Sequence, residues 1–137
     1  MTTRSVTLSL PEFLYIRFQQ MAKATRQPVD DLLVRAVEMG GPPSWEEAPP
    51  RFQTELAALD RMTDDALWRV ARSRHSADDA ARMQALLDGQ ASASLADDEK
   101  SELESMLFQA DLTMLRKAHA AALLRWRGHT IPPAEKL

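Results

Sequence analysis

The pattern of apolar and polar positions changes its period at Pro11. Over residues 4–10 two faces alternate, one of Val6, Leu8 and Leu10 and the other of Ser5, Thr7 and Ser9. A period of two predicts a half-buried β-strand. From about Pro11 to Thr25, and again from about Pro28 to Met39, apolar residues recur with helical spacing. The pattern predicts one strand followed by two helices, and no other stretch predicts a strand.

The isolation of this strand predicts a homodimer. A lone strand leaves its backbone N–H and C=O groups unpaired. Because the chain offers no second strand, the expected partner is the same strand of a second copy, placed antiparallel about a two-fold axis. A two-stranded ribbon is narrow enough to enter the major groove of DNA.

Residues 6–37 also carry a family resemblance. The run VTLSLPEFLYIRFQQMAKATRQPVDDLLVRAV resembles the ribbon-helix-helix superfamily of Arc and MetJ, and more closely its small antitoxin branch. The Leu10-Pro11-Glu12 junction and the two helix spacings carry the likeness. The resemblance implies a dimer that binds operator DNA and often represses its own operon. It also implies a toxin partner, often a nuclease of the PIN or HNH type.

The outward face of the strand and the turn between the two helices are the DNA-binding candidates. The strand face is polar but uncharged where the family usually presents Arg, Lys, Asn or Gln, so base readout would be weak or assisted by water. Asp30 and Asp31 lie in the first turn of the second predicted helix, where they interact favourably with the helix dipole but would repel a phosphate. The predicted contacts are, for the groove, Arg4, Ser5, Thr7 and Ser9 and, for a phosphate, Gln27, Pro28 and Val29.

The rest of the chain predicts a linker and a helical region. Gly and Pro residues concentrate in residues 40–50, which predicts a linker between a dimerisation and DNA-binding domain at 1–39 and a helical, partner-binding region at 51–137. Trp45 inside the linker is either an anchor that docks on a helix or a contact with a partner. The expected fold class is mostly α, with an N-terminal ribbon-helix-helix and a long C-terminal helix.

That long helix, from about Ala96 to Arg127, would span roughly 45 Å. Its apolar positions form two adjacent stripes, broader than one neighbouring helix requires. A local bundle and a partner-binding surface explain the stripes equally well. The predicted partner-binding residues are Trp45, Met114, Arg116, Lys117, His119, Trp126 and Arg127.

Charge is segregated along the chain, whose formal net charge is −3. Residues 76–115 carry nine acidic and two basic side chains, whereas residues 116–137 carry one acidic and five basic side chains. Such asymmetry often marks an interaction surface, and a solvated helix face is the equally good alternative.

Little in the sequence indicates catalysis. His75, His119 and His129 lie far apart, and the chain has no cysteine, so we expect neither a metal site, a cofactor nor a catalytic residue. No signal peptide and no apolar run of membrane length is present. The expected protein is therefore cytoplasmic and not an enzyme, with no membrane partner.

Three functions fit these observations. The leading hypothesis is an antitoxin-like protein that dimerises through its ribbon, binds operator DNA, and neutralises a toxin through its helical region. The alternative is an assembly protein that uses the ribbon only to dimerise. A third, remote hypothesis is RNA binding or ribonuclease chemistry by the basic, histidine-bearing residues 116–129.

Overall fold

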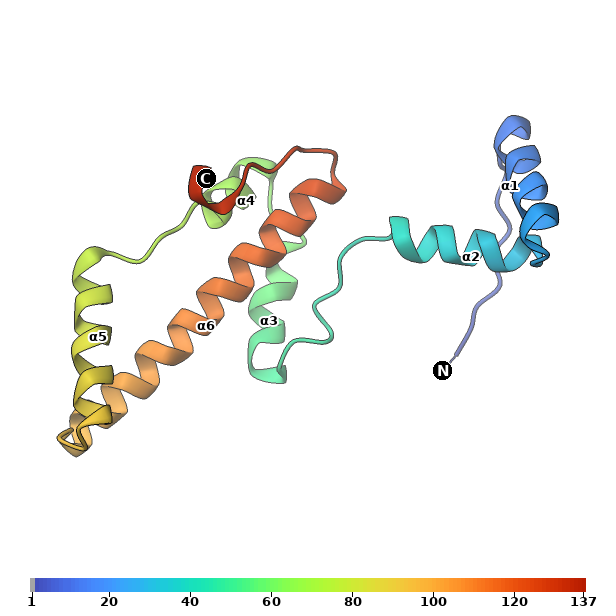
Figure 1. Cartoon of the computed structure of the whole chain (residues 1–137). Coiled ribbons are helices and arrows are strands. Elements are labelled where there is room, and N and C mark those ends of the chain that lie inside the picture. The colour runs from blue at the N-terminus through green and yellow to red at the C-terminus, as the bar shows by residue number, and fades with distance from the viewer. Residues whose placement is uncertain (1) are drawn as a thin grey trace. The chain divides into compact units, whose positions relative to one another are not determined.

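A computed structural model describes residues 2–137, which fold into two compact units that divide after Gly41. Within the described residues there are six α-helices and one short 3-10 helix (Figure 1). The first unit contains α1 and α2, and the second contains all the other helices. Each unit is described by itself below.

In the first unit, α1 (Glu12–Thr25) and α2 (Val29–Gly40) form a helix pair at the positions that the sequence predicts. Arg26 ends α1 in the left-handed conformation, with φ 55°. The Gln27 N–H then donates to the carbonyl of Ala22 at 3.1 Å, a bond typical of helix C-termini. Pro28 directly precedes α2, where its fixed φ suits a helix start.

The predicted strand over residues 4–10 is absent. Residues 2–11 form neither strand nor helix, and residues 2–137 contain no β-strand. The assignment to the ribbon-helix-helix superfamily and the fold class with an N-terminal ribbon are therefore wrong. Alternation gives a segment two faces, but a strand also needs a second backbone to bond, and this chain supplies none. Val6 and Leu8 accordingly remain exposed.

The second unit has a core built by three helices, α3 (Pro50–Leu59), α4 (Asp64–Ala71) and α6 (Asp97–Trp126). Phe52 on α3 lies against α6, where its ring centroid is 5.1 Å from that of Phe108. The buried side chains of this core are Phe52, Leu56, Leu59, Leu67, Ala71, Ala120, Leu123 and Leu124. The contacts of α6 with this core begin at Phe108, so only its C-terminal two thirds reach the core.

The helix starts of this unit follow local sequence signals. The hydroxyl of Thr63 accepts from the Ala66 N–H at 3.3 Å, and that of Ser76 accepts from the Asp79 N–H at 3.1 Å. Thr and Ser are typical N-cap residues, because their hydroxyl groups satisfy an N–H that the helix itself leaves unpaired. At α6 the side chain of Glu99 instead accepts from the Ala96 N–H at 3.2 Å.

The remaining helix, α5 (Ala77–Ala91), runs back along the N-terminal half of α6 and forms a helical hairpin with it. In Figure 1 the two helices meet at residues 92–96 and diverge toward the start of α5. Leu86 and Leu103 are buried between them. A short 3-10 helix, η1 (Ala134–Lys136), follows α6.

None of the helices in residues 2–137 is both long enough and apolar enough to cross a lipid bilayer.

Candidate functional site

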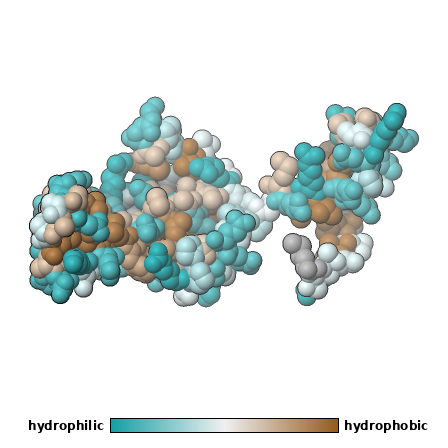
Figure 2. Space-filling view, turned by 60° about the horizontal axis from the view of Figure 1, so that its bottom comes forward, coloured by the Kyte–Doolittle hydropathy of each residue, from teal (hydrophilic) through white to brown (hydrophobic). Residues whose placement is uncertain are grey.

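The surface of the first unit is unusually apolar. Ala22 is its only buried residue among those described. Nine large apolar side chains of the unit are exposed: Val6, Leu8, Phe13, Tyr15, Ile16, Met21, Val34, Val37 and Met39. Figure 2 shows apolar surface in this unit beside polar surface. Exposed apolar side chains in this number are typical of surfaces that bind a partner.

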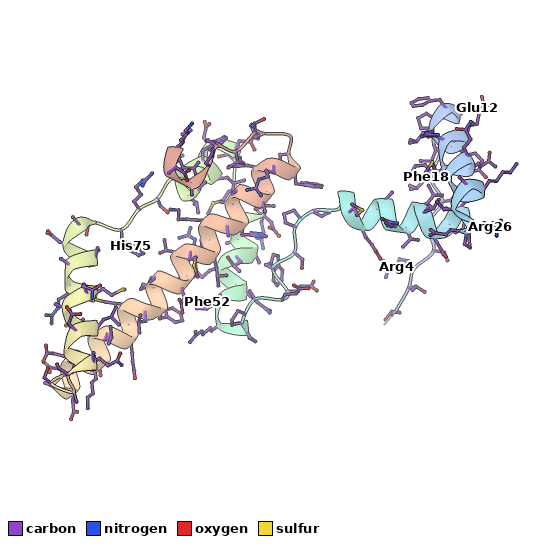
Figure 3. The ribbon with its side chains drawn as sticks, in the orientation of Figure 1. Arg4, Glu12, Phe18, Arg26, Phe52 and His75 are labelled. Atoms are coloured by element: carbon purple, nitrogen blue, oxygen red, sulfur yellow. The ribbon has the colours of Figure 1, made fainter. Side chains whose placement is uncertain are left out.

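Between α1 and α2 the surface forms an open groove of about 420 Å³. Its lining is apolar except for Arg17 and Arg35, and comprises Leu14, Arg17, Phe18, Met21, Leu32, Arg35, Ala36 and Met39. The labelled Phe18 lies on α1, and Arg26 lies at the turn between the helices (Figure 3). The apolar side chains are not confined to the groove, because Phe13 and Tyr15 point about 200° apart around the axis of α1. A helix that is apolar on several sides is normally covered on several sides.

All the predicted DNA-binding residues belong to this unit. Arg4, Ser5, Thr7 and Ser9 are exposed on the segment that precedes α1. Gln27 and Pro28 are exposed in the turn, and Val29 is half-buried. The backbone amide of Gln27 already donates to Ala22, and Pro28 has no N–H, so neither backbone can hold a phosphate there. The predicted DNA-binding residues are accessible, but the turn has fewer free backbone amides for a phosphate than the sequence suggests.

In the second unit, three of the predicted partner-binding residues, Trp45, His119 and Arg127, contact the turn between α3 and α4 of their own chain. Asp60 is in that turn, and its two carboxylate oxygens accept from Trp45 Nε1 at 2.9 Å and from His119 Nε2 at 2.8 Å. His119 is only 7% exposed. Asp60 therefore fastens both the linker and α6 to the core, and Trp45 docks on its own chain.

Asp64, four residues later, repeats this arrangement. Its Oδ1 accepts from Arg127 Nη1 at 2.8 Å, and its Oδ2 accepts from His129 Nε2 at 2.7 Å. Hydrogen bonding to Arg127, followed by that to His129, lowers the pKa of Asp64 below its ordinary value. Arg127 also donates to the carbonyl of Met62 at 2.9 Å. The basic end of α6 is thus held by the first turn of α4.

The other predicted partner-binding residues lie along α6. Met114 and Trp126 are exposed, whereas Arg116 and Lys117 are half-buried. The Nε atom of Arg116 is buried without a hydrogen-bond partner. The role of these four side chains in partner binding stays a prediction.

The two Asp-His pairs resemble the acid–base pairs of some catalytic sites, but their surroundings favour a structural role. His119 is buried and its partner Asp60 is shared with Trp45. His129 shares Asp64 with Arg127 and lies edge-on to Trp68, with ring centroids 6.0 Å apart. His75 lies elsewhere, on the segment before α5 (Figure 3). Within residues 2–137 no cluster of three or more His, Asp or Glu side chains is placed to hold a metal ion.

Sequence reasoning missed two features of the second unit. The first is the pair of carboxylates, Asp60 and Asp64, that accept hydrogen bonds from Trp45, His119, Arg127 and His129 at the α3–α4 turn. The second is a groove of about 370 Å³ between α5 and α6. Met83 and Leu87, four residues apart on α5, line this groove and are half-buried. Their helical spacing is the signal in the sequence, but it does not distinguish a groove from a buried stripe.

Compared with models of protein families, with curated proteins and with solved structures, the chain has no significant match.

Proposed function

We propose that this protein is a non-enzymatic assembly protein, in which the first unit associates with the first unit of a second copy and thereby pairs two helical second units. The observation that carries this proposal is the apolar surface of the α1–α2 pair. Only Ala22 is buried, while Phe13 and Met39 are 76% and 78% exposed. The proposal concerns association through helices and involves no ribbon.

The size of the first unit supports association. A unit of about 40 residues rarely buries enough apolar surface to offset the conformational entropy that it loses on folding. With one small buried side chain, the α1–α2 pair gains little from its own packing. Covering the exposed apolar side chains would supply the missing stabilisation.

A second copy fits this surface in area and in charge. The nine exposed apolar side chains present on the order of 800 Å², close to what each partner contributes to a standard protein interface. Residues 1–41 carry five basic and four acidic side chains, so two copies do not repel each other strongly. Arg17 and Arg35 at the groove can pair with carboxylates such as Glu12 and Glu38 of the other copy.

Hydrogen exchange of the full chain at several protein concentrations tests this proposal. Self-association predicts that the amides of α1 and α2 become more protected as the concentration rises, while those of α3 and α4 do not change. The double variant Val34→Lys with Val37→Lys should abolish the concentration dependence, since both side chains are exposed on α2. Met114→Lys adds a single lysine at an exposed methionine of the other unit and should leave the concentration dependence intact. Protection that is independent of concentration would contradict the proposal.

A second candidate is an antitoxin-like regulator, in which the paired first units bind operator DNA and the second unit binds a toxin. The exposure of all four predicted groove residues, Arg4, Ser5, Thr7 and Ser9, favours it. A gel shift with the DNA upstream of the gene separates the two candidates. Retention that weakens steeply with salt and is lost in Arg4→Ala supports regulation, and no retention at low salt supports assembly alone.

A further inference from the structure

The α5–α6 hairpin is a distinct part of the second unit. Its buried residues Leu86 and Leu103 do not belong to the core that α3, α4 and the end of α6 share. The hairpin therefore has a small core of its own, beside which Met83, Leu87 and Met106 are half-buried and Leu107 is exposed. In Figure 2, apolar surface is visible at the end of this unit where α5 and the start of α6 lie, bordered by polar surface.

The groove between the two helices has an apolar floor. Ala80, Met83 and Leu87 line it from α5, and Met106 and Ala110 line it from α6. The rim contains His75, Asp79, Gln84, Ser105 and Gln109. Both methionines are half-buried. Methionine is flexible and polarisable, so a floor of this kind adapts to the side chains of an inserted helix.

The hairpin that contains the groove is strongly negative. Residues 76–115 carry nine acidic and two basic side chains, a net charge of −7. Arg82, one of the two cations, donates from Nε and Nη2 to the two carboxylate oxygens of Glu102 at 2.9 and 2.7 Å. This pairing raises the pKa of Arg82. Lys100, the other, lies 3.9 Å from Asp97. Both cations are paired within the hairpin, and Asp111 lies 4.0 Å from Arg51 of α3. The carboxylates without a cationic partner, among them Asp79 on the rim, give the hairpin its negative field.

From these observations we propose that the α5–α6 groove binds a basic amphipathic helix of a partner protein. The apolar face of that helix would pack on Met83, Leu87 and Met106, and its Lys and Arg side chains would face the carboxylates of the hairpin. Helices commonly bind apolar grooves in this way, and complementary charge accelerates their association and sets their orientation. This inference rests on the hairpin alone and is independent of self-association by the first unit.

The test uses the full chain and three synthetic helical peptides. The first has a leucine face and a lysine face, the second has the same composition with its leucines scrambled around the helix, and the third has glutamate in place of lysine. Titration at low and moderate salt should show binding of the first peptide, weakened at least tenfold by salt. The scrambled peptide should bind at least tenfold more weakly, and the acidic peptide should not bind. Equal binding of the first two would overturn the proposal, because it would show charge attraction without a groove.

Variants locate the binding site. Gln109→Lys adds a positive charge on the rim at an exposed position, so the fold should survive while binding of the lysine-leucine peptide weakens about tenfold. Ala118→Lys is the matched control, since it adds the same charge to α6 at another exposed position, nine residues and about 180° away around the helix. Equal loss in both variants would contradict the groove assignment. So would a decrease in the solution mass of Gln109→Lys alone, which would identify a second copy of this chain as the occupant.

Discussion

His119 and Asp60, which are 59 residues apart in the sequence, are joined by a hydrogen bond of 2.8 Å between Nε2 and Oδ1. The imidazole is almost completely buried, whereas the carboxylate is partly exposed and also accepts from Trp45. This one acidic side chain connects the linker, the α3–α4 turn and α6. Asp60 thus adds polar contacts between segments that the apolar core also joins.

Asp60→Ala is expected to lower the free energy of unfolding of the second unit by about 1–3 kcal/mol, because it leaves a buried imidazole without its partner. Chemical denaturation measures this loss. Glu55→Ala is the control, since Glu55 is an exposed carboxylate on α3, and its removal should change stability by less than about 0.5 kcal/mol. Equal effects of the two substitutions would show that the Asp60–His119 bond contributes nothing specific.

Asp64 should make stability depend on pH in the acid range. Its pKa is lowered in the folded chain by hydrogen bonds to Arg127 and His129, so its carboxylate stabilises the fold above the ordinary Asp pKa of about 4. That stabilisation is lost as the pH falls through the lowered pKa. Asp64→Asn should therefore be less stable than the parent chain at pH 7, and the difference should shrink below about pH 4.

The comparison is made by denaturation at several pH values, with Asp65→Asn as the control. Asp65 lies in the same first turn of α4 and is exposed. A pH-independent deficit in Asp64→Asn would mean that charge pairing is not the cause.

Ala93 at the α5–α6 turn adopts the left-handed conformation, with φ 57°, which costs L-residues about 1–2 kcal/mol. Ala93→Gly should raise the free energy of unfolding by about 0.5–1 kcal/mol, because the entropy of an unfolded glycine offsets part of the relief. Ala85→Gly, at an exposed position within α5, should lower it by about 1 kcal/mol. Thermal denaturation of both variants checks the opposite signs, and two decreases would contradict the turn geometry.

Leu86→Ala tests whether the hairpin packs apart from the main core. Leu86 is 1% exposed, and its truncation should cost about 2–5 kcal/mol. Hydrogen exchange should show the loss of protection in α5 and the first half of α6. Leu124→Ala, in the main core, should instead reduce protection in α3, α4 and the end of α6. If either variant loosened all helices equally, the hairpin and the core would form one cooperative unit.

The helices were predictable because their signals are local. Thr63 and Ser76 cap the helices that follow them, and the three acidic residues from Asp97 mark the start of α6. The strand was not predictable in the same way. Residues 4–10 have the alternation of a strand, but strand formation depends on a second backbone that lies outside the pattern itself.

The candidate sites were harder to predict, because they depend on contacts between distant residues. Nothing near His119 in the sequence reveals that its imidazole bonds to Asp60 inside the second unit. The sequence therefore predicted a partner-binding role for a histidine that is hydrogen-bonded within its own chain. The groove likewise depends on the divergence of α5 from α6, which half-exposes Met83 and Met106. The segregation of acidic charge in residues 76–115 was visible in the sequence. A binding role for this charge could be inferred only once the structure placed an apolar groove in the same hairpin.

Sedimentation equilibrium of the full chain tests the central claim, self-association through the first unit, most directly. The account predicts a mass of twice the 15.4 kDa of one chain, and a return to the mass of one chain in the double variant Val34→Lys with Val37→Lys. A mass of one chain at every concentration, or a dimer that the double variant leaves unchanged, would contradict it.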